Sequence, residues 1–368
     1  MLELLRERED LWSRLRDIHR TGRPIYLYGM GDGADKILTV LERLGVAPSG
    51  VFASDEFVRG QNFRGFPVRR FSEVKAEHGS AFVALLAFAV DYEPMLSRLY
   101  AMENECGFYA PDVPVVAEGD IRPFDLACLK ESERELDLAY SLLADEQSRR
   151  VFRGTLDFRL SGKVDYLREI TTDRAETWTL IRPTGEEDYV DLGAYNGDTV
   201  AEFLACAGNR YRSITALEPD AKNYEKLCRF FRERGLEHAA ALRMGAWDRA
   251  ETFAIKKGRR GRGSGLLNTV SGASASTETV PADTLDHILN GGPASIIKFD
   301  VEGAESRALS GASETIRRCH PRMILSAYHR NEDLFALPLQ VRELWPEAKL
   351  YLRHHPYIPA WETNYYIL

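Results

Sequence analysis

Three acidic side chains lie at the ends of predicted strands in the C-terminal half of the chain. Asp191 ends an apolar segment that begins at residue 188, Glu218 follows a second such segment, and Asp300 ends a third. Because the strands of a parallel sheet end at one common edge, where open α/β sheets bind their ligands, we expect these carboxylates to line a single crevice. Acidic groups there attract cations and accept hydrogen bonds from hydroxyl groups. The pattern therefore favours a ligand that carries both cationic groups and hydroxyl groups.

A glycine-rich turn follows Asp191 and leads into a helix that we expect to begin near residues 198–199. The turn reads Gly-Ala-Tyr-Asn-Gly over residues 193–197. Glycines allow a sharp turn and a close approach of the ligand to the main chain, and the start of the helix supplies free N–H groups. The spacing Asp-x-Gly-x-x-x-Gly differs from the Gly-x-Gly-x-x-Gly of dinucleotide folds, and a strand that ends in a carboxylate suits a pyrophosphate poorly. We therefore expect a ligand with ammonium and sulfonium groups and no phosphate.

The acidic residue after the second strand, Glu218, lies 21 residues after Gly197. This spacing is comparable with that of the acidic residue that binds the ribose hydroxyls in dinucleotide folds, where one carboxylate accepts both hydroxyl protons. The alternative is an ordinary acid at a helix start, where Asp220 could cap the helix that follows. The glycine turn upstream favours the ribose interpretation.

Several ordered motifs across residues 186–368 resemble those of the FkbM family of methyltransferases. They read DLGAYNGDT, ALEPDAKNYEKL, PADTLDHIL, KFDVEGAE, LSAYHRNEDL and LYLRHH. The family belongs to the Rossmann-like class of S-adenosylmethionine enzymes, so the resemblance implies S-adenosylmethionine as the cofactor and methyl transfer as the reaction. It further implies O-methylation of a sugar or related hydroxyl compound in glycan, lipid or secondary-metabolite assembly.

The resemblance also assigns roles to individual residues. The residues implied to contact the cofactor are Asp191, Gly193, Ala194, Tyr195, Asn196, Gly197, Thr199, Glu218, Pro219, Ala246, Trp247 and Asp300. Among them, the glycine turn surrounds the methionine moiety, Glu218 binds the ribose, and residues 245–247 lie near the adenine. Asp300 and Glu302 face the methyl-transfer centre.

Removal of the proton from an acceptor hydroxyl calls for a base. The candidates are Asp300, Glu302, Glu305 and His329, of which we name Asp300, Glu302 and His329 as the catalytic set. His329 suits the role because a neutral imidazole is matched to physiological pH, although it could equally be a histidine that orients its loop. Asp300 and Glu302 could share a divalent cation, but the spacing offers no third ligand, so no metal site is predicted.

A second glycine motif lies near the N-terminus. Gly29, Gly31 and Ala34 follow a predicted strand and precede a helix, and Asp55 ends the next strand 21 residues after Ala34. This pattern fits the dinucleotide fingerprint and raises an NAD-dependent oxidoreductase as an alternative function. Residues 56–117 offer no obvious hydride-transfer site, so we expect an accessory domain that resembles the small Rossmann-like domains in front of sugar-modifying enzymes. A non-catalytic assembly scaffold is the third hypothesis.

Alternating strand and helix signals divide the chain into three parts. We expect a Rossmann-like domain over residues 1–117, led by an amphipathic helix over residues 2–18, then a helical connector over 118–185 and the methyltransferase domain over 186–368. The predicted fold class is α/β with two Rossmann-like domains. The C-terminal domain is predicted to have a class I methyltransferase fold, a mostly parallel seven-stranded sheet. Its last two strands, joined by a short Pro-containing loop, are expected to close it as an antiparallel hairpin.

Composition excludes several classes of protein. The 368 residues are 44% apolar and 28% charged, as in ordinary folded proteins, and the net charge of −8 argues against a dedicated nucleic-acid binder. The five cysteines are scattered and form no CxxC pair, which argues against a disulfide framework or a zinc site. A charged N-terminus and the lack of an apolar run of about 18 residues predict a cytoplasmic protein without a membrane span.

A segment rich in glycine, serine and basic side chains, residues 256–276, separates two predicted strands. One interpretation is a mobile lid that closes over an anionic acceptor, such as a phosphorylated or nucleotide-linked sugar. The other is a solvated hairpin tip without a role in binding.

Overall fold

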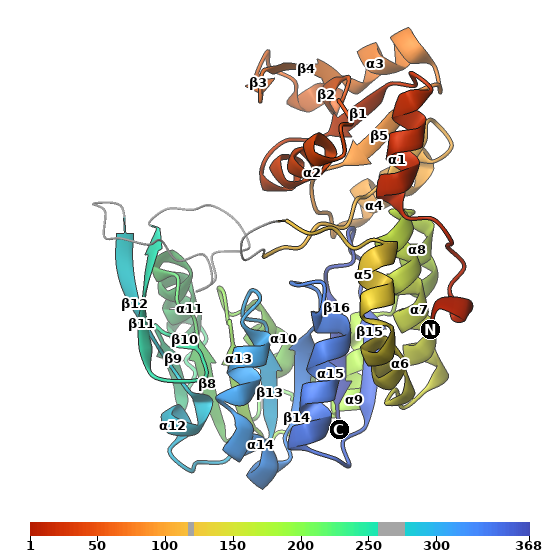
Figure 1. Cartoon of the computed structure of the whole chain (residues 1–368). Coiled ribbons are helices and arrows are strands. Elements are labelled where there is room, and N and C mark those ends of the chain that lie inside the picture. Colours follow the sequence, from red (N-terminus) through yellow and green to blue (C-terminus); the bar gives the residue numbers. More distant parts are fainter. Residues whose placement is uncertain (117–120, 257–276) are drawn as a thin grey trace. The chain divides into compact units, whose positions relative to one another are not determined.

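Two mainly parallel β-sheets organise the chain, one in each of two units (Figure 1). The computed structural model describes residues 1–116, 121–256 and 277–368. The first unit comprises Met1–Asp137, Arg149–Thr172 and His354–Glu362, and the second comprises Leu138–Ser148, Asp173–Arg353 and Thr363–Leu368. The α/β fold class with two Rossmann-like sheets is confirmed, whereas the domain boundaries at residues 117 and 185 stay predictions.

The sheet of the first unit has six strands in the order β3-β4-β2-β1-β5-β6. The strands are β1 (Ile25–Tyr28), β2 (Gly50–Ala53), β3 (Asn62–Phe63), β4 (Phe66–Arg70), β5 (Val83–Leu86) and β6 (Gly107–Tyr109). All neighbouring pairs are parallel except β3 and β4. Every residue of β1, β2 and β5 is buried, which is typical of short apolar strands that are covered on both faces.

The N-terminal half of the chain also contains helices, of which α1 and α2 pack against this sheet. They are η1 (Leu2–Leu4), α1 (Leu11–Arg20), α2 (Asp32–Arg43), η2 (Asp55–Phe57), α3 (Phe71–His78), α4 (Glu93–Met102), α5 (Leu126–Glu131), α6 (Glu133–Ser141), α7 (Glu146–Ser161) and α8 (Asp165–Ile170). Leu15 of α1 and Leu41 of α2 join Leu27, Val51 and Leu85 of the strands in one buried apolar cluster. The apolar face of each helix is thus buried against the sheet, as expected for an amphipathic helix.

The N-terminal amphipathic helix is shorter than predicted, because α1 begins only at Leu11. Asp10 caps the helix, since its side chain accepts the Ser13 N–H at 2.8 Å. The backbone N–H groups of residues 6 and 7 both donate to Asp157 Oδ1 at 2.9 Å. These contacts hold the residues before Leu11 outside the helix. Hydrophobic periodicity predicts neither a helix cap nor a hydrogen-bond partner far away in the sequence.

The main sheet of the second unit has seven strands in the order β15-β16-β14-β13-β7-β8-β9. The strands are β7 (Asp188–Leu192), β8 (Ser213–Leu217), β9 (Ala239–Leu242), β13 (Ile296–Phe299), β14 (Arg322–Ser326), β15 (Leu350–His354) and β16 (Thr363–Ile367). Neighbours from β9 to β14 are parallel. The strands that follow β7 in the chain, β8 and β9, lie on one side of it, and β14 lies on the opposite side of β13. The boundary between β7 and β13 is therefore a switch point in the strand order, and open α/β sheets bind ligands outside such a point.

The last two strands form the predicted antiparallel hairpin. Lys349 and Leu368 exchange backbone hydrogen bonds of 2.8 and 3.0 Å, and β16 also pairs antiparallel with β14. A separate three-stranded sheet has the order β10-β12-β11. Its strands are β10 (Gly245–Ala246), β11 (Glu251–Lys256) and β12 (Thr277–Asp283). The strand predicted before the glycine-rich segment therefore exists as β11, outside the main sheet.

Helices lie on both faces of the seven-stranded sheet (Figure 1). They are α9 (Arg174–Ile181), α10 (Asp198–Cys206), α11 (Ala221–Glu233), α12 (Leu285–Leu289), α13 (Glu305–Ser310), α14 (Ser313–Cys319) and α15 (Asp333–Leu344). Residues 257–276 of the segment interpreted as a lid lie outside the described residues.

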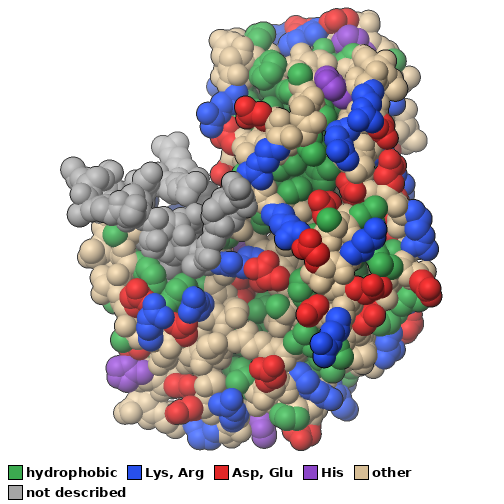
Figure 2. Space-filling view, in the orientation of Figure 1, with side chains coloured by type: hydrophobic (Ala, Val, Ile, Leu, Met, Phe, Trp, Pro, Cys, Tyr) green, Lys and Arg blue, Asp and Glu red, His purple; other side chains and the backbone are tan. Residues whose placement is uncertain are grey.

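Two global features bear on possible partners. Within the described ranges, none of the helices combines the length and the apolar character that a bilayer span requires. On the face drawn in Figure 2, the described basic and acidic side chains are interspersed.

Candidate active site

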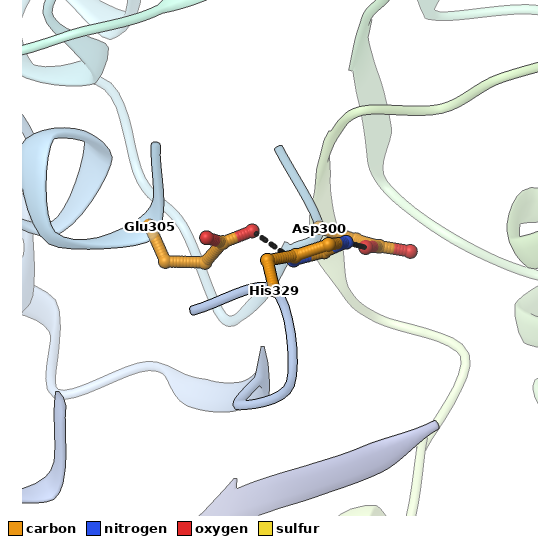
Figure 3. A group of neighbouring side chains, drawn as sticks. All are labelled: Asp300, Glu305 and His329. Atoms are coloured by element: carbon orange, nitrogen blue, oxygen red, sulfur yellow. Dashed lines mark ion pairs between the residues drawn. The ribbon is translucent and has the colours of Figure 1, made fainter. Parts of the chain in front are cut away.

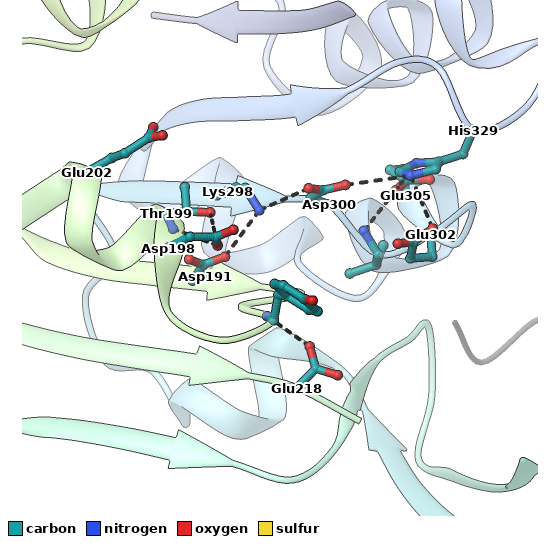
Figure 4. A network of polar contacts seen from close by, with 12 residues as sticks. Asp191, Asp198, Thr199, Glu202, Glu218, Lys298, Asp300, Glu302, Glu305 and His329 are labelled. Atoms are coloured by element: carbon teal, nitrogen blue, oxygen red, sulfur yellow. Dashed lines mark hydrogen bonds and ion pairs between the residues drawn. The ribbon is translucent and has the colours of Figure 1, made fainter. Parts of the chain in front are cut away.

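Lys298 links two of the predicted carboxylates at the ends of strands β7 and β13 (Figure 4). It is in register with Asp191 across the two parallel strands, so both side chains lie on the same face of the sheet. Lys298 Nζ lies 3.6 Å from Asp191 Oδ1 and donates to Asp300 Oδ2 at 3.2 Å. Asp191 is fully buried, and Lys298 is 8% exposed. Sequence reasoning missed Lys298, although a lysine inside an apolar strand is a signal for a buried ion pair.

The pKa values of this triad follow from burial and from the ion pairs. Burial opposes the charged form of Lys298, but Asp300 and Asp191 outweigh it and raise the lysine pKa. Burial raises the pKa of Asp191 to about 6 against the attraction of Lys298. Burial also opposes ionisation of Asp300, but Lys298 and His329 prevail and lower its pKa to about 2. Lys298 therefore neutralises part of an edge that the sequence predicts to be wholly acidic.

The turn after β7 brings the main chain of residue 193 against that of residue 300. Gly193 has φ +90°, and a Cβ atom there would lie 1.9 Å from the Asp300 carbonyl oxygen. Its N–H donates to the Leu217 carbonyl at 3.0 Å, which ties the turn to β8. Gly197 has φ +92°, and a Cβ atom there would lie 2.5 Å from the Phe230 ring. Packing of the turn therefore requires both glycines, whether or not a ligand is bound.

Glu218 is buried directly after β8 and faces the glycine turn. One carboxylate oxygen accepts the Tyr195 N–H at 2.9 Å, and the other accepts the Asp220 N–H at 2.8 Å. Burial raises the pKa of Glu218 to about 8. The cap of α11 is Asp220, whose side chain accepts the N–H groups of Lys222 and Asn223, each at 3.0 Å. Of the two alternatives drawn from the sequence, helix capping thus belongs to Asp220.

His329 follows β14 and lies among three carboxylates. Its Nδ1 is 3.0 Å from Glu305 Oε1, and its Nε2 is 3.6 Å from Asp300 Oδ1 and 3.5 Å from Glu302 Oε2 (Figures 3 and 4). Glu305 Oε1 also accepts the Val301 N–H at 2.9 Å. Burial alone would lower the pKa of His329, but Glu305, Glu302 and Asp300 together raise it to about 10.

The four candidate bases differ in exposure and in charge. The side chains of Asp300 and Glu302 are 26% and 27% exposed, whereas those of Glu305 and His329 are 0% and 2% exposed. With a pKa of about 10, His329 is an imidazolium at neutral pH and has no lone pair for a proton. Asp300 and Glu302 are therefore the carboxylates that a substrate can reach.

The remaining residues implied to bind the cofactor fall into two groups. Those near the glycine turn, which are mostly half-buried, are Ala194, Tyr195, Asn196, Thr199 and Pro219. Ala246 and Trp247 are buried beside the small sheet, where Trp247 packs edge-on against Phe253 with ring centroids 4.9 Å apart. The apolar cluster around Trp247 includes Ala304. Trp247 therefore lies against the loop that carries Glu302.

Packing and backbone conformation account for the two glycines of the first unit. A Cβ atom at Gly29 would lie 2.5 Å from the Phe88 ring. Asp55, the acid of the dinucleotide fingerprint, accepts the Ser72 N–H at 3.1 Å. Gly31 caps the start of α2 with φ +106°. These contacts stabilise the fold of the unit and require no nucleotide.

The chain is similar to known proteins over its C-terminal part and, in one case, over nearly its whole length. Residues 191–359 match the family model described as methyltransferase FkbM domain. A crystal structure of methyltransferase FkbM from Methylobacillus flagellatus KT is 19% identical, covers 98% of this chain and 94% of its own, and has a TM-score of 0.72. At that identity the likeness shows the fold. No match was found among curated proteins.

Two further structures resemble part of the chain. An rRNA methylase from Streptococcus thermophilus is 15% identical, covers 52% of this chain and 91% of its own, and has a TM-score of 0.35. Fibrillarin from Aeropyrum pernix, with natively bound S-adenosyl-L-methionine, is 9% identical and has a TM-score of 0.33. The match covers 53% of this chain and 73% of the fibrillarin chain.

Proposed function

We propose that the chain transfers the methyl group of S-adenosylmethionine to a hydroxyl oxygen of a sugar or related acceptor. The premise is that residues 191–359 match the family model of the methyltransferase FkbM domain. The observation that carries the proposal is the meeting of three acidic groups on adjacent strands. Strands β8, β7 and β13 are neighbours, and Glu218, Asp191 and Asp300 lie at their carboxyl ends. A ligand with a sulfonium, an ammonium group and ribose hydroxyls meets complementary groups there.

The residues of this edge fit S-adenosylmethionine in charge and in hydrogen-bonding capacity. Each oxygen of Glu218 accepts one backbone N–H, and a carboxylate has about four acceptor sites, so capacity remains for two ribose hydroxyls. Lys298 offsets one of the two charges of Asp191 and Asp300. One negative charge then remains for the cationic end of the ligand.

Methyl transfer to a hydroxyl group requires few catalytic functions from the protein itself. S-adenosylmethionine, when bound, supplies a methyl group already activated on a positive sulfur. The acceptor oxygen forms the new bond to carbon, the electron pair of the broken carbon–sulfur bond stays on sulfur, and the hydroxyl proton must leave. Asp300 and Glu302 are the exposed carboxylates that orient the hydroxyl and take its proton.

Glu218→Gln is expected to weaken the binding of S-adenosylhomocysteine, the product of the proposed reaction, by about 10–150-fold at pH 9. The substitution replaces a charged acceptor by a neutral one, and hydrogen bonds to charged groups contribute about 1.5–3 kcal/mol. Isothermal titration calorimetry measures the affinity. Glu225→Gln, at an exposed position of α11, is the control and should bind like the wild type. Equal affinities of all three proteins would contradict a ribose site at Glu218.

The affinity of the wild type for S-adenosylhomocysteine is expected to rise as the pH increases from about 6 to 9. Burial, aided by Asp220 and Glu302, raises the pKa of Glu218 to about 8 against the backbone N–H groups of Asp220 and Tyr195. Below that pH the ligand must displace a proton, at a cost of up to about tenfold in affinity per pH unit. Calorimetry across this range should show the slope in the wild type and a flatter profile in Glu218→Gln.

The reaction itself is tested with S-adenosylmethionine labelled in its methyl group. The full chain is incubated with free, phosphorylated and nucleotide-linked sugars, and the expected product carries the label as an O-methyl ether. Glu302→Gln should slow label transfer and leave cofactor affinity largely unchanged. If the folded chain does not bind S-adenosylmethionine or S-adenosylhomocysteine, the proposed function is wrong.

A further inference from the structure

Glu302 lies in a tight turn whose backbone conformation is unusual for a glutamate. The turn comprises residues 301–304, shortly after β13, and the Ala304 N–H donates to the Val301 carbonyl at 3.3 Å. Its two central residues, Glu302 and Gly303, have φ values of +55° and +91°. Positive φ at both central positions is typical of a type I′ turn, which glycine, asparagine and aspartate occupy most readily. A glutamate there costs stability, and such strain is found mostly at functional sites.

Hydrogen bonds from neighbouring segments hold this turn in place. Arg330, in the loop after β14, donates its Nε–H to the Gly303 carbonyl at 2.8 Å. The main chain of Arg330 is itself fixed, because its N–H donates to the buried Asp333 carboxylate at 2.8 Å. At the start of the turn, the Val301 N–H donates to the buried Glu305 carboxylate at 2.9 Å. The turn is therefore anchored on both sides of its strained residue.

The other three candidate bases are poorly suited to accept a proton. Both oxygens of Asp300 already accept hydrogen bonds, one from Lys298 Nζ and one from the Tyr328 hydroxyl, each at 3.2 Å. With a pKa of about 2, the Asp300 carboxylate is also a weak base. His329 is an imidazolium at neutral pH because its pKa is about 10. The side chain of Glu305 is 0% exposed, so an acceptor does not reach it.

Glu302 combines an exposed carboxylate with a fixed backbone. Its side chain is 27% exposed, and its Oε2 lies 3.5 Å from His329 Nε2 (Figure 4). The imidazolium attracts the carboxylate and helps to fix its orientation, while the exposed surface lets an acceptor approach. Resting on the proposed function, we propose that Glu302 accepts the proton of the acceptor hydroxyl and that Arg330 is the positioning residue for this base.

The proposed step moves one methyl group and one proton. The acceptor oxygen forms its bond to the methyl carbon, and the carbon–sulfur bond breaks with its electron pair on sulfur. The hydroxyl proton passes to a carboxylate oxygen of Glu302, which becomes a neutral carboxyl group. Since this side chain is 27% exposed, it then releases the proton to water. Asp300, held by Lys298 and Tyr328, stays ionised and orients the hydroxyl group.

Label transfer from methyl-labelled S-adenosylmethionine to free, phosphorylated and nucleotide-linked sugars tests the role of Arg330 in the full chain. Arg330→Gln removes a hydrogen bond from a charged donor and is expected to slow transfer by about 10–150-fold, with S-adenosylhomocysteine affinity largely unchanged. Arg330→Lys should recover part of the rate, because an ammonium group can also donate to the Gly303 carbonyl. Arg318→Gln is the matched control. Arg318 donates to the Gly292 carbonyl at the same distance, 2.8 Å, at an exposed position, and its loss should leave the rate unchanged.

Glu302→Gly separates the chemical role of this residue from any role in the fold. Glycine adopts a φ of +55° without strain, so the urea midpoint should not fall below that of the wild type, whereas transfer should slow by about 10²–10⁴-fold. Formate, a small carboxylate, should accelerate this variant and not the wild type. His238→Gly is the control, because His238 is exposed and also has a φ of +55°. It should keep both the stability and the rate.

Several results overturn the proposal. Transfer by Glu302→Gly at the wild-type rate excludes Glu302 as the base, as does a variant that formate does not accelerate. Equal rates of Arg330→Gln and Arg318→Gln exclude a positioning role. A loss of S-adenosylhomocysteine affinity in Arg330→Gln as large as the loss of rate also excludes it, because that pattern indicates a general structural defect. Circular dichroism checks each fold, and Arg330→Lys, expected to be slower than the wild type, is the second test should Arg330→Gln not fold.

Failure of this assignment can be told apart from failure of the proposed function. A wild type that binds S-adenosylhomocysteine and transfers label, together with an equally active Glu302→Gly, overturns the assignment and leaves the proposed function intact. A wild type that does not bind S-adenosylhomocysteine, or that transfers no label to any of these sugars, overturns the proposed function and the assignment with it.

Discussion

Replacing Lys298 by methionine is expected to lower the free energy of unfolding by about 3–5 kcal/mol. The substitution keeps an apolar stem of similar length but removes the ammonium group, whose Nζ lies 3.6 Å from Asp191 and 3.2 Å from Asp300. Asp191 is fully buried, so its carboxylate would face a second carboxylate without a counter-ion. Urea denaturation followed by circular dichroism measures the change.

Two further variants make the Lys298→Met result specific. Arg249→Met removes a 61% exposed guanidinium group that pairs with Asp248 and Glu251, and it should cost less than about 1 kcal/mol. Adding Asp191→Asn to Lys298→Met should recover part of the lost stability, since it removes the buried carboxylate that Lys298→Met leaves without a counter-ion, whereas Asp300 still pairs with His329. Equal losses in Lys298→Met and Arg249→Met would contradict a buried ion pair.

Gly193→Ala is expected to destabilise the fold by about 2–5 kcal/mol and to abolish S-adenosylhomocysteine binding. The new Cβ atom would lie 1.9 Å from the Asp300 carbonyl oxygen, so the turn after β7 must move away from β13, and overpacking of this kind costs about 1–3 kcal/mol. The positive φ of +90° adds about 1–2 kcal/mol for a residue with a Cβ atom. Urea denaturation and calorimetry measure the two effects.

Gly208→Ala separates the clash at Gly193 from the backbone strain. Gly208 also has a positive φ, +64°, but a Cβ atom there would meet no atom within 4 Å. This variant should lose only about 1–2 kcal/mol and should bind S-adenosylhomocysteine normally. A Gly193→Ala protein that is as stable as Gly208→Ala and binds the ligand would show that the close approach of the two main chains is not required.

The elements that carry the site could be predicted because their local patterns agree with the tertiary fold. An apolar run such as residues 295–300, which ends in an acid, suits a parallel strand covered on both faces, with the carboxylate at the ligand-binding edge. The short Pro-containing loop before β16 likewise leaves an antiparallel hairpin as the simplest pairing. The segment before α1 is the exception, because Asp157, far along the chain, holds residues 6 and 7 by hydrogen bonds.

The sequence by itself determined which acids stand at strand ends and therefore where a ligand-binding edge should form. Only the tertiary structure decided the partners of those acids. The register of β13 against β7 sets Lys298 beside Asp191, and the pairing of β13 with β14 places His329 against Glu302 and Glu305. The physical reason is that burial and chain periodicity act locally, whereas side-chain partners depend on the register between segments far apart in the chain.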